Sequence, residues 1–406
     1  MDACFRTRPL HHVRNAQARR AVPWPAALDA ILSPADVAAA HAEISTWPDY
    51  APTPLRSLEL LATSIGVEAV AYKDEASRFG LGSFKALGGA YAVACLLQRE
   101  LTIRLGRDIT LAEVRSGTLA DEIAKITVCT ATDGNHGRSV AWGAQMFGCP
   151  CVIYIHAEVS AGRKVAMEAF GARVVRIDGN YDESVRAIDR DANRSGWYVV
   201  SDTSYEGYVE LPRTVVAGYT VLMEEIAAVE SAPWTHVFVQ GGVGGLASAV
   251  CGHLWQRFGA QRPRMIVVEP AFAACLFESA RAGAIRAVDV TQESLMAGLS
   301  CGEVSPISWE ILRECVDYFL AIDEALVAPC MQMLAGAEAS SEKIVAGESG
   351  VAGLAGLLAA VERSEVRAAL DLRADSRVLL IGSEGATDPD IYAELVGQRP
   401  DAVASA

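Results

Sequence analysis

One stretch of sequence decides the class of fold: His236-Val237-Phe238-Val239-Gln240-Gly241-Gly242-Val243-Gly244-Gly245-Leu246-Ala247. A short apolar run predicts a strand, four glycines in the next five positions predict a tight loop, and the residues that follow predict a helix. Glycines let the backbone approach an anion closely, and the positive end of the following helix points at it. The stretch therefore predicts an α/β unit with a phosphate-binding loop at the end of a strand.

The same alternation of apolar runs and helical stretches extends from about residue 68 through the rest of the chain. Because nearly all of these runs lack polar alternation, we expect two lobes, each with a mostly parallel sheet flanked by helices. We expect a large domain over residues 1–88 and 205–406 and a small domain over residues 89–204. The predicted strands are Ala69–Lys73, Ile126–Ala131, Cys151–Ile155, Ala172–Ile177, Tyr198–Val200, Val237–Gln240, Met265–Glu269, Tyr318–Ile322 and Arg377–Ile381.

The first 67 residues differ from the rest because they are rich in Pro and Trp. They predict one helix, over residues 34–46, followed by a turn-rich segment up to Pro54. We expect this part of the chain to pack across the surface or against a partner subunit.

Composition excludes several classes of protein. The 406 residues are 51% hydrophobic and 21% charged, as in a globular protein, and the net charge of −15 disfavours nucleic acid and anionic lipid. The longest apolar run, residues 351–361, is well short of the about 20 residues of a spanning helix, so we expect a buried core helix there. No apolar segment of a secretory signal precedes Pro23. We expect a cytoplasmic protein that binds neither membrane nor nucleic acid.

The ten cysteines are too sparse for a disulfide scaffold, and neither they nor the seven histidines show the spacing of metal ligands. We therefore expect no metal. Cys149 and Cys151 are expected to be buried structural thiols. A bridge between Cys275 and Cys301 stays open, although a reducing compartment disfavours it.

A second stretch, Ser83-Phe84-Lys85, places a lysine in the predicted first turn of a helix that Ser83 would cap. The positive end of the helix dipole disfavours an ammonium group there, so the neutral amine of Lys85 is favoured. A neutral amine can form a Schiff base with a carbonyl compound. The alternative is a solvated lysine on an exposed helix face.

A third stretch, residues 130–137, follows a predicted strand and precedes a predicted helix over residues 138–147. Backbone amides at the start of such a helix can hold a carboxylate. The alternative is a local cap formed by the side chain of Asp133 or Asn135.

Two cofactors fit the glycine loop. Residues 242–247 satisfy GxGxxA, and Glu269 ends the next strand, as in nicotinamide-binding folds. That interpretation leaves Lys85 and the Asp133 segment without a role. A lysine for a Schiff base and a glycine loop for a phosphate together fit pyridoxal phosphate (PLP), whose aldehyde and phosphate need these two partners.

Four segments, in this order, resemble the tryptophan-synthase-β class of PLP enzymes: Ser83-Phe84-Lys85, Gly134-Asn135-His136, residues 241–245 and residues 382–385. Within that class the chain resembles the diaminopropionate ammonia-lyases from about residue 45 to 393. Six blocks carry this resemblance: residues 73–75 with 78–81, residues 131–138, residues 202–203 with 206–208, residues 296–299, residues 347–350, and residues 383–385 with 387–388.

The resemblance implies roles for individual residues. Lys85 would bind the cofactor as a Schiff base and remove the α-proton, Asn135 would bind the phenolic oxygen, and Ser383 would face the pyridine nitrogen. Asp133 would bind the β-ammonium group and serve as the base for the D enantiomer, and Asp202 would bind the substrate's amino group. The amides that bind the cofactor's phosphate would be those of Gly241, Gly242, Val243, Gly244 and Gly245. The further substrate-binding residues would be Ser83, Thr132, Gly134, His136 and Tyr181.

The reaction that the resemblance implies is α,β-elimination of both enantiomers of 2,3-diaminopropionate to pyruvate and two ammonia. A serine opposite the pyridine nitrogen favours elimination over transamination, because it does not keep the ring protonated as a carboxylate would. The alternatives are a serine or threonine dehydratase, a lyase acting on another β-substituted alanine, and a non-catalytic sensor. Asp133 argues against a hydroxyl leaving group. The family also implies a homodimer.

Overall fold

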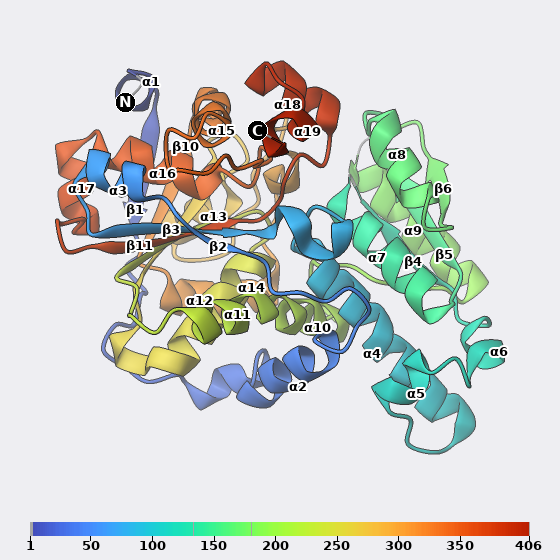
Figure 1. Ribbon diagram of the computed structural model, residues 1–406. Helices are drawn as coiled ribbons and strands as arrows, with labels where there is room; N and C mark the ends of the chain where they lie inside the picture. Colours follow the sequence, from blue (N-terminus) through green and yellow to red (C-terminus); the bar gives the residue numbers. More distant parts are fainter. Residues whose placement is uncertain (1–2, 133, 180, 406) are drawn as a thin grey trace. The chain divides into compact units, whose positions relative to one another are not determined.

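The computed structural model describes residues 3–132, 134–179 and 181–405, without the side chains of residues 181 and 182. The chain forms two compact α/β units (Figure 1). The larger unit comprises Met1–Pro34, Ala51–Ser83 and Leu222–Ala406, and the smaller comprises Ala35–Tyr50 and Phe84–Val221. The boundaries expected from the sequence place residues 35–50, 84–88 and 205–221 in the larger unit instead.

Close packing of two helices explains why residues 205–221 belong with the smaller unit. Helix α10 (Glu210–Tyr219) packs along α4 (Lys85–Leu105) at a pair of glycines. A Cβ atom at Gly218 would lie 2.6 Å from the carbonyl oxygen of Leu87 and 2.8 Å from Cα of Gly88. Only glycines allow the two backbones to come this close.

The larger unit contains a seven-stranded sheet with the order β1-β10-β9-β8-β11-β3-β2. The five inner strands are parallel to one another, and β1 and β2 are antiparallel to their neighbours at the two edges. The strands are β1 (Leu10–Arg14), β2 (Leu55–Ser57), β3 (Ala69–Asp74), β8 (His236–Gln240), β9 (Arg264–Pro270), β10 (Tyr318–Ile322) and β11 (Arg377–Gly382).

Helices cover both faces of this sheet (Figure 1). The apolar helix α16 lies over β8, β9, β10 and β11, and its residues 352–360 are all buried in the main core. Helix α12 contacts β8 and packs on α14. The helices of this unit are α1 (Cys4–Thr7), α3 (Glu59–Ile65), α11 (Val221–Val229), α12 (Gly245–Phe258), α13 (Cys275–Ala282), α14 (Pro306–Cys315), α15 (Val327–Ala335), α16 (Ala352–Val361), α17 (Ser364–Leu370), α18 (Pro389–Val396) and α19 (Pro400–Ala404).

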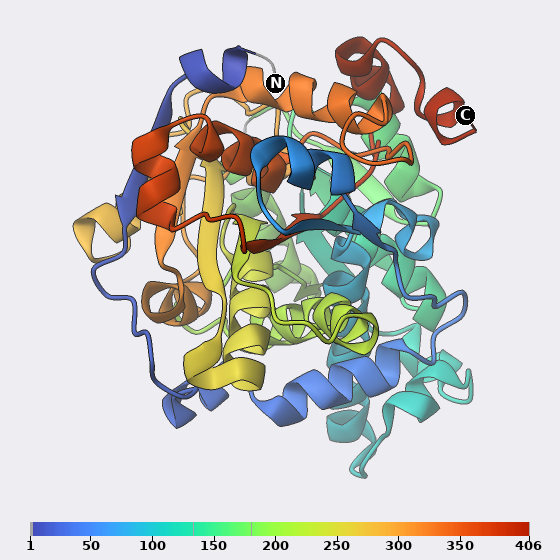
Figure 2. The ribbon, with the colours of Figure 1, turned by 60° about the vertical axis from the view of Figure 1, so that its left-hand side comes forward.

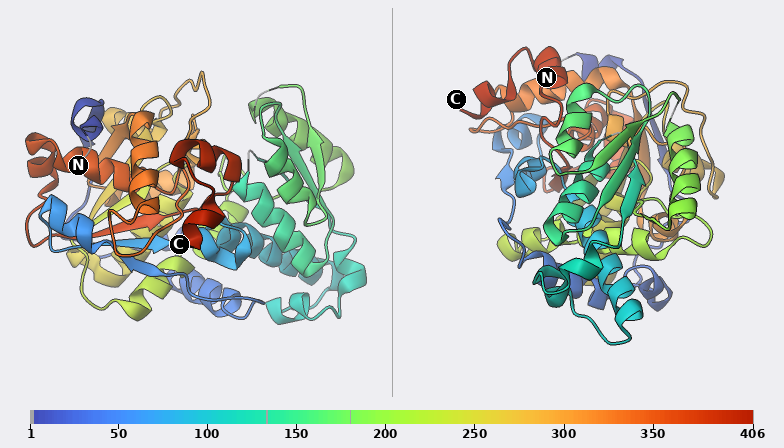
Figure 3. Two further views of the ribbon diagram at one scale, coloured as in Figure 1. Left: turned by 45° about the horizontal axis from the view of Figure 1, so that its top comes forward. Right: turned by 90° about the vertical axis from the view of Figure 1, so that its right-hand side faces the viewer.

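The smaller unit contains a four-stranded parallel sheet with the order β6-β5-β4-β7. Helix α9 covers the face that carries Cys129, Val152 and Tyr154, and α7 also contacts β4 and β5. Figure 3 (right) shows helices on both sides of these strands, which agrees with the complete burial of β5. The elements are β4 (Val128–Ala131), β5 (Cys151–Ile155), β6 (Arg173–Arg176), β7 (Tyr198–Val199), α2 (Pro34–Ile44), α4 (Lys85–Leu105), α5 (Leu111–Arg115), α6 (Ala120–Ile123), α7 (Asn135–Phe147), α8 (Ala161–Glu168), α9 (Tyr181–Ser195) and α10 (Glu210–Tyr219).

All nine predicted strands are confirmed, with ends that differ by at most two residues, and the predicted N-terminal helix is α2. The sequence missed β1 and β2. Both are short edge strands with many exposed residues, so they lack the continuous apolar run that marks the inner strands. Figure 2 shows the dark-blue β1 along one edge of the larger sheet, where Leu10 pairs with Ile322.

Four buried charges form a closed network in the larger unit. Arg78 donates to the carboxylates of Glu75 and Glu225 at 2.7–2.9 Å, and Lys73 Nζ donates to Glu225 at 2.6 Å. Each of these side chains is at most 2% exposed. Two positive and two negative charges compensate one another, so the network ties β3 to α11 without a net buried charge.

Within the described ranges, no helix is both long and apolar enough to span a membrane. The same residues contain no group of three or more His, Cys, Asp or Glu side chains that could hold a metal ion.

Candidate active site

The glycine loop of the larger unit follows β8 as expected. Gly242 and Gly244 have φ angles of +62° and +100°, in the left-handed region that favours glycine. A Cβ atom at Gly241 would lie 2.4 Å from Cγ of Glu269, so no side chain fits at that position either. The backbone of the loop therefore surrounds a space that side chains at the glycine positions would fill.

Helix α12 starts at Gly245, directly after this loop, and its N-cap residue Gly244 makes no side-chain capping bond. The first amides of a 14-residue helix and the positive end of its dipole therefore lie at the loop. This arrangement suits a phosphate group, so the loop fits the phosphate of PLP.

Gln240, the last residue of β8, holds the turn that follows β11. Its Nε2 atom donates to the carbonyl of Ile381 at 2.6 Å and to that of Ser349 at 3.0 Å, and it lies 3.2 Å from Oγ of Ser383. Ser383 is buried, and its hydroxyl is therefore held in one place. The sequence analysis missed Gln240, although an amide at the end of an otherwise apolar strand was a signal.

Buried polar atoms without a partner lie on Gln240 and on Ser349, whose carbonyl Gln240 binds. Among the described residues, Oε1 of Gln240 and Oγ of Ser349 have none. Native proteins rarely leave such atoms unpaired, because burial without a hydrogen bond is costly. Since the side chain of Gln240 also contacts Ser383, its unpaired oxygen fits the presence of a polar bound group there.

Lys85, in the smaller unit, is the first residue of α4. Its ammonium group forms an ion pair with Asp202, and its Nζ atom lies 5.5 Å and 5.8 Å from the ring centres of Phe84 and Tyr219. The carbonyl of Lys85 accepts a hydrogen bond from Ser139 of α7 at 2.6 Å. The side chain is 19% exposed, so the alternative of a solvated lysine is wrong.

The helix start is not capped as predicted. Phe84 occupies the N-cap position and makes no side-chain capping bond. Ser83 lies in the larger unit, where it is buried and forms an antiparallel backbone bridge with Glu384. The expected Ser83 cap is therefore wrong, because this residue still belongs to the turn that precedes the helix.

Asp202 lies between Lys85 and His136. Burial raises the pKa of its carboxyl group, but the charges of Lys85 and His136 outweigh this effect and hold that pKa well below its ordinary value. A carboxylate at this position stabilises the ammonium form of Lys85. Helix position alone favoured a neutral amine, because Asp202 is distant from Lys85 in the chain.

The imidazole of His136 points at the same carboxylate. Its Nε2 atom lies 2.9 Å from the carbonyl oxygen of Val200, and since a carbonyl only accepts, Nε2 carries the hydrogen. Its Nδ1 atom lies 3.8 Å from Oδ2 of Asp202 and has no hydrogen-bond partner among the described residues. Lys85, Asp202 and His136 therefore form one chain of ionisable groups.

Helix α7 starts at Asn135, three residues earlier than predicted, so Asn135 and His136 lie in its first turn. The cause is Thr132, whose Oγ1 atom accepts hydrogen bonds from the amides of Gly134 and Gly137 at 3.1 Å. Thr132 thus caps this turn.

Two predicted site residues lie partly or wholly outside the described structure. Asp133 falls outside the described residues. Tyr181 begins α9, and its side chain is also outside the described part.

The carboxyl group of Glu269 is not available to bind a nucleotide. Its carboxyl group is completely buried and accepts the amides of Leu276 and Phe277 at the start of α13, at 3.0 Å and 2.7 Å. Burial raises the pKa of Glu269 to about 8. Since these bonds occupy the carboxyl group, the nicotinamide interpretation does not fit.

The described cysteines form no disulfide, so Cys275 and Cys301 are not bridged. Cys149 and Cys151 are buried, as expected for structural thiols, and burial raises the pKa of Cys149 to about 12.

Comparison with known proteins decides the family. The family model of pyridoxal-phosphate dependent enzymes matches residues 46–384. Diaminopropionate ammonia-lyase of Escherichia coli (strain K12) is 40% identical over 87% of this chain and 89% of its own. The chain belongs to the diaminopropionate ammonia-lyase family. The Salmonella typhimurium member of this family is 37% identical over 86% of the chain and 89% of its own length.

Solved structures of the diaminopropionate ammonia-lyase family agree with this fold. The Escherichia coli enzyme in complex with an aminoacrylate-PLP azomethine reaction intermediate has a TM-score of 0.85 and 36% identity over 96% of this chain and 97% of its own. Threonine deaminase isoform 2 from Solanum lycopersicum, at 21% identity and a TM-score of 0.72, shows the same fold. The predicted family, the predicted fold class and the dependence on PLP are confirmed.

Proposed function

We propose that the protein is a PLP-dependent carbon–nitrogen lyase that converts 2,3-diaminopropionate and water to pyruvate and two ammonia. The reaction loses the β-amino group first, and the unsaturated amino acid that remains tautomerises and takes up water to release the second ammonia. The observation that carries the proposal is the Lys85–Asp202 ion pair at the start of α4, in a chain of the diaminopropionate ammonia-lyase family.

When bound, PLP withdraws electrons from Cα of the attached amino acid and so makes the α-proton acidic. The Lys85 amine would anchor the cofactor at its aldehyde, and Asn135 would bind its phenolic oxygen. Ser383 would donate to the pyridine nitrogen. The loop amides of Gly241, Gly242, Val243, Gly244 and Gly245 would bind the phosphate, which the uncapped start of α12 supports.

Lys85 would remove the α-proton of the L enantiomer after the substrate has replaced it on the cofactor. Asp202 would keep the side chain of Lys85 oriented and contribute to binding the substrate's amino group. The ion pair supports this role because a carboxylate beside Nζ stabilises the ammonium group that proton removal creates.

Asp133 would select the substrate. Its carboxylate would bind the β-ammonium group through a charge-assisted hydrogen bond and would remove the α-proton of the D enantiomer. Other groups that would contact the substrate belong to Ser83, Thr132, Gly134, His136 and Tyr181. For Thr132 this role would come in addition to its capping of α7.

The protein is further proposed to be a cytoplasmic homodimer. The alternatives within the enzymes are a serine or threonine dehydratase and a lyase acting on another β-substituted alanine. A non-catalytic sensor is disfavoured by the partly buried ion pair of Lys85 with Asp202, which such a protein would not need.

Pyruvate release tests the proposal. The purified PLP-loaded protein should act on L- and D-diaminopropionate with kcat/KM at least about tenfold above that for L-serine, because the charge-assisted bond to Asp133 is lost with a hydroxyl group. Asp133→Asn should lower the rate with the D enantiomer more than with the L enantiomer. A higher kcat/KM on serine would contradict the proposal, and so would a protein that binds PLP but releases no pyruvate from either enantiomer.

A further inference from the structure

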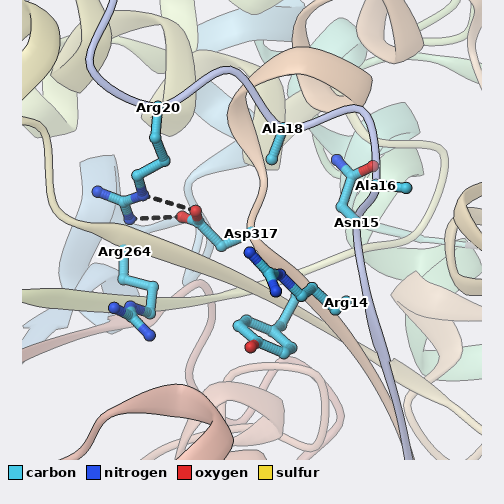
Figure 4. Close-up of a pocket in the computed structure, with 8 residues that line it drawn as sticks. Arg14, Asn15, Ala16, Ala18, Arg20, Arg264 and Asp317 are labelled. Carbon is cyan, nitrogen blue, oxygen red and sulfur yellow. Dashed lines mark hydrogen bonds and ion pairs between the residues drawn. The ribbon is translucent and has the colours of Figure 1, made fainter.

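A cavity of about 460 Å³ lies at one end of the sheet in the larger unit (Figure 4). Its walls come from the carboxyl end of β1, the segment that follows β1, and the amino ends of β9 and β10. Because β8, β9 and β10 are parallel, this end of the sheet is opposite to the one where the glycine loop follows β8. The cavity is therefore separate from the loop proposed for the cofactor.

Three arginines and one aspartate dominate its lining. Arg20 donates through Nε and Nη2 to the two carboxylate oxygens of Asp317, each at 2.6 Å. Asp317 also accepts the amide of Met265 at 2.8 Å. The charge of Asp317 is thus taken up by Arg20, which leaves the other two arginines without this counter-ion.

Arg14 and Arg264 are weakly compensated. Figure 4 shows the three arginines around Asp317, with dashed lines only from Arg20. Arg264 lies 3.4 Å from Asp371, a carboxylate that Arg373 binds at 2.6 Å. Arg14 is exposed to solvent, and its guanidinium has no ion pair or hydrogen bond among the described residues.

The backbone around Arg14 is fixed before any ligand arrives. The neighbouring Asn15 is buried, and its Nδ2 atom donates to the carbonyls of Arg313 and Val316 at 2.9 Å and 2.7 Å. The backbone amide of Asn15 donates to the carbonyl oxygen of Asp317 at 2.9 Å. The backbone that carries Arg14 therefore need not become ordered when a ligand binds.

We propose that this cavity binds the phosphate group of a small phosphorylated molecule through Arg14 and Arg264. The planar guanidinium group donates two parallel hydrogen bonds to a phosphate, and a phosphate monoester carries nearly two negative charges at neutral pH. It therefore matches the two arginines in charge, which a carboxylate with one negative charge does not. The volume leaves room for an organic group of modest size.

Isothermal titration of the PLP-loaded protein with inorganic phosphate and with glycerol 3-phosphate tests this proposal. Both should bind with one site per chain in the millimolar range or tighter at constant ionic strength, and acetate should bind at least tenfold more weakly. Arg14→Gln and Arg264→Gln should each weaken phosphate binding at least tenfold. Arg399→Gln, which changes the net charge equally at an exposed position, should leave binding unchanged.

Arg14→Lys separates charge from shape, since it keeps the charge and loses the paired donors. It should bind phosphate more weakly than the native protein and more tightly than Arg14→Gln. Circular dichroism of each variant establishes that it is folded. The proposal is wrong if the native protein shows no heat of binding, or if folded Arg14→Gln and Arg264→Gln bind phosphate as the native protein does.

Discussion

Lys85 and Asp202 lie 117 positions apart in the chain and form an ion pair within the smaller unit. Lys85 starts α4, and Asp202 follows β7, so the pair joins a helix start to the end of a parallel strand. Asp202 also faces His136, which extends the pair to three groups. The first three predictions concern these residues.

Replacement of Lys85 by alanine should abolish the visible absorption of the PLP-loaded protein and lower kcat at least about 1000-fold, because no amine remains to bind the aldehyde or to remove the α-proton. Absorption spectra and pyruvate release measure both effects. Lys164→Ala, at a lysine of α8 paired with Glu168, is the matched control and should retain both properties. Full activity of Lys85→Ala would rule out its proposed role.

Replacement of Asp202 by asparagine should lower the Tm of the apoprotein at pH 7 by at least about 2–4 °C, which corresponds to about 1 kcal/mol in a unit of this size. The cause is the loss of the counter-ion of Lys85. Because the pKa of Asp202 is depressed, its stabilisation is fully present above the ordinary value of 3.8 and declines as the pH falls below it. The difference in Tm between the two proteins should become smaller from pH 7 to pH 3. A Tm difference that is constant with pH would contradict this account.

His136→Gln should lower kcat about tenfold, because His136 acts on Lys85 through Asp202, and should also raise KM, because His136 is proposed to contact the substrate. Glutamine can still donate to the carbonyl of Val200, so folding should be retained. His136→Ala also removes that hydrogen bond and should cost a further about 1–3 kcal/mol of stability. Equal stability of the two variants would show that the bond to Val200 is unimportant.

Gln240→Leu should weaken PLP binding and destabilise the protein by about 1–3 kcal/mol, since it leaves the buried carbonyls of Ile381 and Ser349 unpaired and frees Ser383. Equilibrium titration of PLP and urea unfolding measure the two effects. Gln332→Leu is the control, because that exposed glutamine bonds a single carbonyl. Unchanged PLP affinity in Gln240→Leu would remove Gln240 from the candidate site.

Glu225→Gln should destabilise the protein by about 3–5 kcal/mol, because Lys73 and Arg78 would then be buried with one carboxylate between them. Burial raises the pKa of Glu225, but bonds with Arg78 and Lys73 outweigh it and lower that pKa to about 2. The stabilisation is therefore fully present above the ordinary value of 4.5 and is lost as the pH falls toward 2.

Denaturant unfolding between pH 7 and pH 3 should reveal this loss in the native protein but not in Glu225→Gln. Glu224→Gln changes the neighbouring, more exposed carboxylate and should have a smaller effect. A parallel acid dependence in both proteins would assign the loss to other groups.

Much of the fold and of the candidate site could be predicted from the sequence because the patterns that mark them are local. Continuous apolar runs such as residues 318–322 mark the inner strands, and the four glycines after Gln240 mark a loop in which Gly242 and Gly244 take backbone conformations that favour glycine. The order of Lys85, the Asn135 segment, the glycine loop and Ser383 predicted the class of PLP enzymes. Six blocks of residues predicted the family, and the comparisons confirmed both. The edge strands β1 and β2 escaped prediction because they have only a few residues and no continuous apolar run.

Only the tertiary structure decided which groups meet. The sequence assigned Lys85 a neutral amine from its helix position, whereas folding brings Asp202 beside it and His136 beside Asp202. In the same way, Glu269 ends a strand as a nucleotide-binding acid would, yet the fold buries it under the start of α13. The physical reason is that periodicity and turn chemistry act over a few residues, while charge and burial depend on neighbours that are distant in the chain and absent from any local pattern.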